Sequence, residues 1–383
     1  MTGVAIVGAG DIANTHIEAY LRFPERCRIV MLVDRLVGKA KEKAEKYGLD
    51  CQISGDWKDI TKRSDVDLVS ICLPPSLHCE TVCQLLLAGK HVLCEKPMAP
   101  TLEECDRMLE AEKRGGGKLS IVAQNRFKPD IRKTKEMLDR EYFGPIYGAQ
   151  INSLWWRGSH YYDLCWRGTW EKEGGGCTFS HAVHHIDLFL WFMGDVQEIS
   201  SVVTNQNHRN SEVEDYSIHT IHFKSGALGL VVCSLLHHGE EQKMIIDAKE
   251  GTIEIPHKIS VSRQLANGYP EPDEEKRQEL ERLFESMEAP EYSGHEGQIE
   301  NMLTAIEQGG SPLVTGAEGR KTIEFIMAAY QSAFTGKPVQ LPMTEKDLFY
   351  TKKGLMSRVT RFYEKKESVE SFQDIGISVG GSL

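Results

Sequence analysis

Apolar and polar positions follow two different patterns in the two parts of the chain. In the first third, short and mainly apolar runs lie at residues 4–7, 29–33, 66–73, 92–94 and 121–123, as in strands buried on both faces. Helical spacing separates them at 39–47, 78–88 and 101–113, and Thr101 with Glu104 predicts a capping box at the start of the last helix. Strands that alternate with helices predict a doubly wound parallel sheet.

After residue 143 the expected strands are separated by turns more often than by helices. They lie at residues 148–156, 198–204, 216–223, 227–235, 243–248 and 252–255. Residues 271–287 have the pattern of a polar surface helix, 295–307 and 319–333 are further helices, and the tail from Glu364 shows no packing signal. This part is therefore predicted to be an α+β domain with a large, mostly antiparallel open sheet.

Composition places the chain among soluble globular proteins with two domains. It has 383 residues, of which 40% are hydrophobic and 26% charged, and its net charge of −11 argues against a nucleic-acid or anionic-membrane partner. The ten cysteines form no CxxC pair, which is typical of a reducing compartment. No apolar run is long enough to span a membrane, and the first strand begins directly after Gly3, so we expect no signal peptide and a cytoplasmic protein.

A glycine-rich turn follows the first strand. Residues Gly8 to Ala13 have the GxGxxA spacing, in which glycines let the backbone approach a diphosphate and the helix N-terminus offers its amides. The second strand ends at Asp34, where a carboxylate can bind ribose hydroxyls and repel a 2′-phosphate, although Arg35 stands beside it. The motif predicts a Rossmann domain that binds NAD in preference to NADP, with contacts from Gly8, Gly10, Asp11, Ile12, Ala13, Asp34 and Arg35.

A charged pair ends the apolar run of Val92 to Cys94. Glu95 and Lys96 come directly after it, and Pro97 fixes the turn. Ligands of open parallel sheets bind just beyond the carboxyl ends of the strands. Lys96 is therefore predicted to act on a bound ligand.

An aromatic and basic window lies at residues 155–170 and holds four of the six tryptophans in the chain. Aromatic faces can stack on sugar rings, and arginines can bind sugar hydroxyls. The window thus favours a sugar-like ligand over the alternative of a loop packed by its own aromatic side chains. The predicted substrate contacts in and near it are Trp155, Arg157, Trp166 and Arg167.

Three histidines follow the glycines at 174–176, where the pattern becomes helical up to Gly194. On one continuous helix, His181, His184 and His185 would share a face. They can be read as a catalytic group, as a metal site through i and i+4 ligands, or as packed core histidines. Because no acidic third ligand appears at a clear spacing, we expect no metal.

These motifs together resemble the glucose–fructose oxidoreductase / inositol dehydrogenase (Gfo/Idh/MocA) family. The resemblance covers about residues 3 to 343, and its most specific element is Glu95-Lys96-Pro97. It also rests on Gly8, Gly10, Ala13, His16, Pro74, Pro75, His78, Asn125, Arg126, Phe127, Pro129, Gly174–Gly176, His184, Asp187, Trp191, Pro312, Gly319 and the stretch from Ser332 to Leu341.

The resemblance implies roles for several of these residues. Lys96 and His184 would be catalytic, and the cofactor would also contact Leu73, Pro74, His78, Glu95 and Lys96. Substrate contacts would include Arg126, Ser180, His181, His184 and His185. We assign a dinucleotide-binding Rossmann domain to residues 1–125, a substrate-binding and oligomerisation domain to 126–345 and a C-terminal extension to 346–383, with a homo-oligomer formed through the exposed face of the second sheet.

One position departs from the family pattern. Members such as inositol dehydrogenases carry Asp four residues before the catalytic histidine, where this chain has Ser180. Serine can cap a helix or bind a substrate hydroxyl, but it cannot stabilise an imidazolium by charge. His184 should therefore be less basic, or His181 or His185 substitutes for the missing acid.

The predicted activity is NAD-dependent oxidation of a secondary hydroxyl of a sugar or glycoside. Lys96 would orient the hydroxyl and lower its pKa, and His184 would take its proton. Position C3 of a hexoside is favoured over free inositol because of the aromatic window and Ser180. The alternatives are an inositol or polyol dehydrogenase, an enzyme with permanently bound NAD that interconverts two sugars or cleaves glycosides through a ketone, and a non-catalytic sensor. The sensor is disfavoured because binding alone needs neither Lys96 nor His184.

Overall fold

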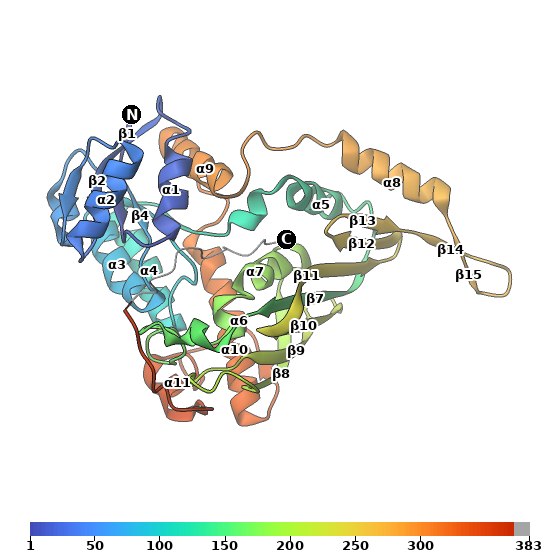
Figure 1. Ribbon diagram of the computed structural model, residues 1–383. Helices are drawn as coiled ribbons and strands as arrows, with labels where there is room; N and C mark the ends of the chain where they lie inside the picture. The colour runs from blue at the N-terminus through green and yellow to red at the C-terminus, as the bar shows by residue number, and fades with distance from the viewer. Residues whose placement is uncertain (371–383) are drawn as a thin grey trace.

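The computed structural model describes residues 1–370, which are built around two sheets (Figure 1). The first is a six-stranded parallel sheet in the order β3-β2-β1-β4-β5-β6. Its strands are β1 (Thr2–Val7), β2 (Cys27–Val33), β3 (Gln52–Ser54), β4 (Leu68–Ile71), β5 (His91–Cys94) and β6 (Leu119–Ile121). Helices α1 (Ile12–Tyr20), α2 (Val37–Tyr47), α3 (His78–Leu87) and α4 (Leu102–Gly115) connect them. The predicted doubly wound sheet is confirmed, and its strand order reverses between β1 and β4, where ligands of such sheets bind.

The second sheet has eight strands in the order β13-β12-β11-β7-β10-β9-β8-β16. All neighbours are antiparallel except β7 and β10, which confirms the predicted mostly antiparallel open sheet. The strands are β7 (Ile146–Trp156), β8 (Val196–Thr204), β9 (Tyr216–Phe223), β10 (Leu228–Ser234), β11 (Leu236–Ala248), β12 (Gly251–Ile255), β13 (Lys258–Ser260) and β16 (Val339–Gln340).

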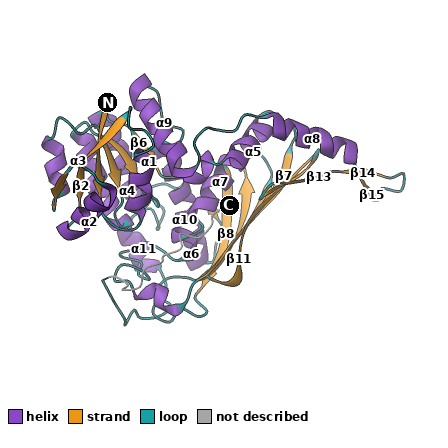
Figure 2. Cartoon of the chain, turned by 45° about the horizontal axis from the view of Figure 1, so that its top comes forward, coloured by secondary structure: helices purple, strands orange, loops and turns teal. Residues whose placement is uncertain are grey.

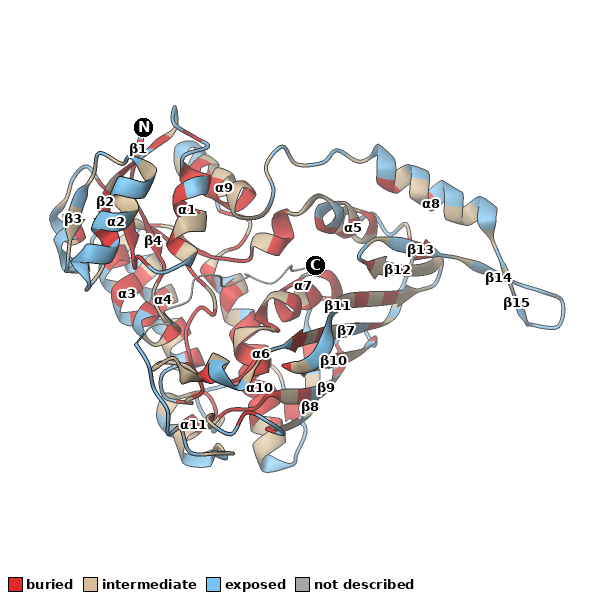
Figure 3. Ribbon diagram, in the orientation of Figure 1, coloured by how far each residue is buried: buried red, intermediate tan, exposed pale blue. Residues whose placement is uncertain are grey.

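Helices cover one face of this second sheet and leave the other open (Figure 2). They are α5 (Pro129–Asp139), α6 (Cys177–Ser180), α7 (Val183–Met193) and α10 (Gly316–Thr335). Buried and exposed residues alternate along β9, as expected for a strand with one packed face (Figure 3). The open face carries exposed apolar side chains, among them Val202, Ile218 and Leu228.

The helix predicted at residues 271–287 is α8 (Glu274–Ser286), which lies on an arm that projects from the body (Figure 1). The arm also carries the hairpin of β14 (Ser262–Gln264) and β15 (Pro270–Pro272). Helix α9 (Gly294–Gln308) returns the chain to the first sheet and packs on α1. None of the helices in residues 1–370 combines the length and the apolar character needed to cross a membrane.

Part of the chain after residue 345 packs against the body, although its sequence shows no such signal beyond Glu364. Helix α11 (Lys352–Arg358) buries Leu355, and the amide of Val369 donates to the carbonyl of Asp163 at 2.7 Å. The backbone therefore pairs with the loop that follows β7. Residues 371–383 of the predicted extension lie outside the described part.

The capping box predicted at the start of α4 is present in part. The hydroxyl of Thr101 accepts from the amide of Glu104, which confirms Thr101 as the N-cap, but the Glu104 carboxylate contacts that hydroxyl at 2.9 Å and not the Thr101 amide. One apolar core runs through both parts of the molecule, since Val69 of the first sheet and Ile151 of the second belong to the same cluster.

A buried arginine joins the segment after β6 to two helices of the second part. Arg126 lies in the short 3-10 helix η3 (Gln124–Phe127), and its side chain is 2% exposed. Its guanidinium makes two hydrogen bonds of 2.8 Å to Asp187 on α7 and one of 3.0 Å to Glu318 on α10. All three nitrogens of the guanidinium thus donate to carboxylates of the protein. Arg126 was predicted to contact the substrate, but its hydrogen bonds in the structure are made within the protein.

We expect Arg126→Met to destabilise the protein by about 3–5 kcal/mol, because it leaves the Asp187 carboxylate buried without its charge partner. Urea denaturation followed by circular dichroism measures this difference. Arg140→Met is the matched control, since Arg140 forms an exposed pair with Glu136 and should cost less than about 1 kcal/mol. Equal stability of the two variants would contradict the structural role of Arg126.

Candidate active site

The turn after β1 has the backbone shape that a dinucleotide needs. Gly8 has a φ of +97°, and a Cβ there would lie 2.4 Å from the carbonyl oxygen of Cys72, so only glycine fits. A Cβ on Gly10 would meet no atom within 4 Å, which leaves open space beside the turn. Asp11 is the N-cap of α1, and Ile12 and Ala13 are its first residues, so the N-terminus of this helix lies at the turn.

The carboxylate of Asp34 stands beside this turn. It accepts hydrogen bonds of 2.7 Å from the amides of Ala9 and Leu36, while the neighbouring Arg35 is exposed. The negative charge is thereby fixed at the end of β2, next to the open glycine turn. This arrangement fits NAD, whose ribose hydroxyls can donate to a carboxylate.

Lys96 follows β5 and reaches toward the second part of the molecule. Its ammonium nitrogen lies 3.5 Å from the carbonyl oxygen of Ser180 at the end of α6. Burial lowers the pKa of Lys96, while the negative charges of Glu95 and Glu173 act in the opposite direction. The ammonium group is therefore partly desolvated, and its charge interacts strongly with neighbouring polar groups.

His184 shares a small cavity with Lys96. The cavity has a volume of about 20 Å³, enough for one water molecule, and Asp187 also lines it. Burial and the nearby Lys96 charge hold the pKa of His184 well below the ordinary 6.5. The imidazole is consequently neutral at neutral pH and can accept a proton.

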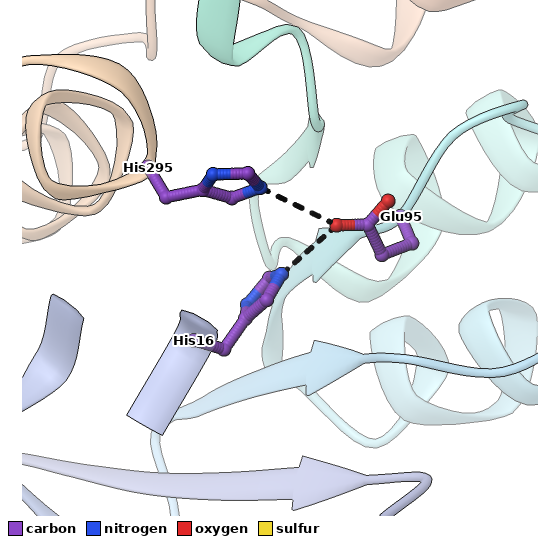
Figure 4. A group of neighbouring side chains, drawn as sticks. All are labelled: His16, Glu95 and His295. Atoms are coloured by element: carbon purple, nitrogen blue, oxygen red, sulfur yellow. Dashed lines mark hydrogen bonds and ion pairs between the residues drawn. The ribbon is translucent and has the colours of Figure 1, made fainter. Parts of the chain in front are cut away.

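Glu95 is fixed by two histidine side chains from different helices (Figure 4) and by one backbone amide. His16 of α1 places Nε2 3.0 Å from Oε1 of Glu95, His295 of α9 places Nε2 3.7 Å from the same oxygen, and the amide of Lys96 donates to Oε2 at 3.1 Å. Although burial raises the pKa of Glu95, its contacts with the two histidines hold it well below its usual value. The carboxylate is thus ionised and holds the backbone of the turn that follows β5.

The same three side chains have a spacing that could suit a metal ion. Their ligand atoms lie within 4.8 Å of one another, in the single group of this kind found among residues 1–370. A metal ion would replace the hydrogen bond between His16 and Glu95. Because the hydrogen bonds of Glu95 explain the arrangement, we assign no metal to it.

His78 connects the two turns that follow β4 and β5. Its Nε2 lies 2.8 Å from the carbonyl oxygen of Leu73, and its Nδ1 lies 3.0 Å from that of Pro97. The ring is fully buried, while Leu73 and Pro74 remain half-buried at the carboxyl edge of the sheet. His78 therefore supports the predicted cofactor-binding turns from behind.

The three histidines do not share a helix face, and that prediction is wrong. The expected continuous helix is broken into α6 and α7 by a turn at His181 and Ala182. The amide of Ala182 donates to the carbonyl of Cys177, five residues earlier, at 2.9 Å. This wider turn separates His181 from His184.

His181 and His185 contact aromatic side chains, and neither lines the cavity beside Lys96. The His185 ring stacks on Trp155, with 13° between the planes, and its Nδ1 lies 2.7 Å from the hydroxyl of Ser153. Burial lowers the pKa of His185 to about 3. The His181 ring lies 5.4 Å from that of Tyr161. Of the three, His184 is the one that lines the Lys96 cavity.

Two tryptophans of the aromatic window belong to the core. Trp155 is 5% exposed, and Trp170 is buried with its indole N–H donating to the carbonyl of Glu212 at 3.2 Å. The alternative of a loop packed by its own aromatics therefore describes these two residues, because their faces are covered by protein. Arg157 pairs with Glu240 at 2.8 Å.

A buried acid that the sequence analysis did not identify lies behind Ser180. The hydroxyl of Ser180 donates to Oε1 of Glu173 at 2.7 Å, and Arg167 approaches the same oxygen at 3.3 Å. The Arg167 guanidinium lies 4.1 Å from the ring centre of Tyr161 and 4.2 Å from that of Trp166. In the sequence, Glu173 directly precedes the glycines at 174–176, but no spacing pattern there indicates that it would be buried beside Ser180.

Both parts of the chain match models of one oxidoreductase family. Residues 2–122 match its NAD-binding Rossmann fold, and residues 135–341 match its C-terminal alpha/beta domain.

Individual relatives are similar over most of the chain. The D-glucoside 3-dehydrogenase of Escherichia coli is 26% identical over 364 residues, which cover 88% of this chain and 97% of the relative. The myo-inositol 2-dehydrogenase of Thermotoga maritima is 24% identical over 343 residues, covering 88% and 98%. The crystal structure of the WlbA dehydrogenase of Bordetella pertussis in complex with NADH and UDP-GlcNAcA has a TM-score of 0.76 at 27% identity, covering 89% and 99%.

Since the two family models match in chain order, and the first of them opens on a glycine turn with room for a dinucleotide, the chain belongs to the Gfo/Idh/MocA family of NAD-binding oxidoreductases.

Proposed function

We propose that this protein oxidises a secondary hydroxyl of a sugar or glycoside, with C3 of a hexoside as the favoured position. The observation that carries the proposal is that Lys96 and His184 line one cavity at the carboxyl edge of the parallel sheet. The similarity to the D-glucoside 3-dehydrogenase and to the WlbA structure supports the substrate class.

The chain's own groups can carry out the proton chemistry of such a reaction. The ammonium of Lys96 donates a hydrogen bond to the reacting hydroxyl and lowers its pKa by its charge. The neutral ring of His184 takes the hydroxyl proton. The carboxylate of Glu95 accepts a hydrogen bond from the Lys96 amide and so fixes the backbone at Lys96. The glycine turn and Asp34 would hold NAD, which would supply the hydride acceptor of the reaction.

We also propose that the protein is a homo-oligomer that associates through the open face of the second sheet. That face carries Val202, Ile218 and Leu228, which are 64%, 36% and 55% exposed. Exposed apolar side chains grouped on one face are typical of a protein–protein contact.

We expect turnover with NAD to exceed that with NADP by at least about tenfold, because the Asp34 carboxylate repels a 2′-phosphate. Asp34→Ser should narrow the preference, measured as the ratio of kcat/KM values for the two cofactors. Asp50→Ser serves as control, since Asp50 is fully exposed at the surface. Equal or better turnover of the wild type with NADP would show that Arg35 receives the phosphate.

Lys96→Met should remove most turnover while leaving NAD binding and the melting temperature nearly unchanged, because the lost charge acts on the reacting hydroxyl. A panel of hexosides, assayed by the absorbance of reduced nicotinamide, measures the activity, and calorimetry measures NAD binding. Lys39→Met, at an exposed position on α2, is the matched control. Unchanged turnover would make Lys96 structural, and a wild type active on amino acids but on no sugar would refute the substrate class.

The pH–rate profile should report a neutral His184. Since burial and Lys96 lower its folded pKa well below 6.5, the base is available at and above pH 6.5, and the acid limb lies below that value. His184→Ala should remove this limb and lower kcat by about 10²–10⁴-fold. His185→Ala is the control, because its ring packs on Trp155 away from the cavity. An unchanged profile in His184→Ala would mean that another group is the base.

A further inference from the structure

Ser180 combines a place beside the catalytic lysine with a buried ionic partner. Its carbonyl oxygen lies 3.5 Å from the Lys96 ammonium, and its half-buried side chain lies at the end of α6. Its hydroxyl donates to Glu173 at 2.7 Å. Lys96 therefore contacts the backbone of the same residue whose hydroxyl is paired with Glu173.

Glu173 is a buried carboxyl group surrounded by hydrogen-bond donors. Its side chain is 1% exposed, and burial raises its pKa above the ordinary value, although the Arg167 charge and the hydrogen bonds from Ser180 and Gly168 act in the opposite direction. The amide of Gly168 donates to Oε2 at 2.6 Å, and Arg167 donates to Oε1 at 3.3 Å. All three neighbours are thus arranged as donors around one carboxylate.

The direction of the hydrogen bond follows from the inventory of donors. An ionised carboxylate can only accept, and a serine hydroxyl has one proton with two acceptor lone pairs. In its hydrogen bond to ionised Glu173, Ser180 is therefore the donor. Toward any ligand its oxygen can then act only as an acceptor.

We propose that Ser180, held in this state by Glu173, selects substrates with a second hydroxyl next to the one being oxidised. Ser180 would accept the proton of that neighbouring hydroxyl, and Glu173 is the positioning residue that sets the direction. The selected class is vicinal diols, which include hexosides and cyclitols, with the second hydroxyl free. The inference rests on the proposed function and adds a requirement at one substrate position.

The acceptor-only oxygen of Ser180 disfavours substituents that cannot donate a hydrogen bond on the carbon next to the one being oxidised. A fluorine, an ether oxygen or a carbonyl cannot donate to Ser180, so each would face an acceptor with an acceptor. Loss of a hydrogen bond to a charge-assisted partner costs about tenfold or more in affinity.

The test measures binding without turnover. Methyl glucoside and its monodeoxyfluoro analogues are titrated into the protein saturated with NADH, and the dissociation constants are obtained by calorimetry. We expect one fluorine position adjacent to the oxidised carbon to weaken binding to the wild type by about tenfold or more. Ser180→Ala should reduce this discrimination to less than about threefold, and Ser286→Ala, on the exposed end of α8, should leave it unchanged.

Glu173→Gln tests the direction of the hydrogen bond. A neutral amide can donate to Ser180 and free the serine proton for the ligand, so the discrimination against fluorine should shrink or reverse. Glu173→Asp keeps the charge and should retain it. If Glu173 has only a structural role, Glu173→Gln should weaken the binding of all analogues by the same factor, and that result would overturn the proposal. Ser180→Ala measures the discrimination against fluorine independently, in case Glu173→Gln is less stable.

The outcomes separate this inference from the proposed function. If the wild type binds the sugars but Ser180→Ala keeps the full discrimination, the role of Ser180 is refuted while the sugar assignment stands. If neither methyl glucoside nor any analogue binds, and no hexoside is oxidised, the sugar assignment fails and the inference fails with it.

Discussion

The carboxylate of Glu95 is the point on which the active-site architecture depends. It receives His16 from the helix that follows the glycine turn, the backbone of Lys96 from the end of β5, and His295 from a helix that returns after the second sheet. Three segments far apart in the chain are thereby tied to one buried charge. Loss of either histidine would leave that buried charge less well compensated. The helix after the glycine turn and the turn after β5 are therefore linked through Glu95.

Burial of the same region sets opposite protonation states on two neighbours. Desolvation disfavours the charged form of both Lys96 and His184, but their ordinary pKa values differ by about four units. Both groups shift downward, so Lys96 can remain an ammonium while His184 is a neutral base. A shared low-dielectric cavity thus holds a proton donor and a proton acceptor together at neutral pH, as acid–base chemistry at a hydroxyl requires.

The sequence was sufficient for features that depend on local patterns. The parallel sheet, the glycine turn with Asp34, the cap at Thr101 and the placement of Lys96 after β5 all follow from spacing within a few residues. The break between α6 and α7 could not be predicted, because an i to i−5 hydrogen bond leaves no pattern in side-chain polarity. Arg126, His295 and Glu173 were missed or placed differently because their partners are set by tertiary contacts, as with Arg126 and Glu318, which are 192 residues apart.

Much of the aromatic window packs within the protein, which its composition alone did not indicate. Tryptophans at 155 and 170 serve the core, and Tyr161 and Trp166 enclose Arg167, which in turn faces Glu173. Tyr161 and Trp166 thus pack on a partly buried ion pair, whereas Trp156 is 44% exposed. A hydrogen bond in such a setting discriminates more strongly than an apolar contact, because an unpaired buried group is costly. Specificity in this protein is therefore expected to depend on the direction of individual hydrogen bonds at Ser180 and Lys96.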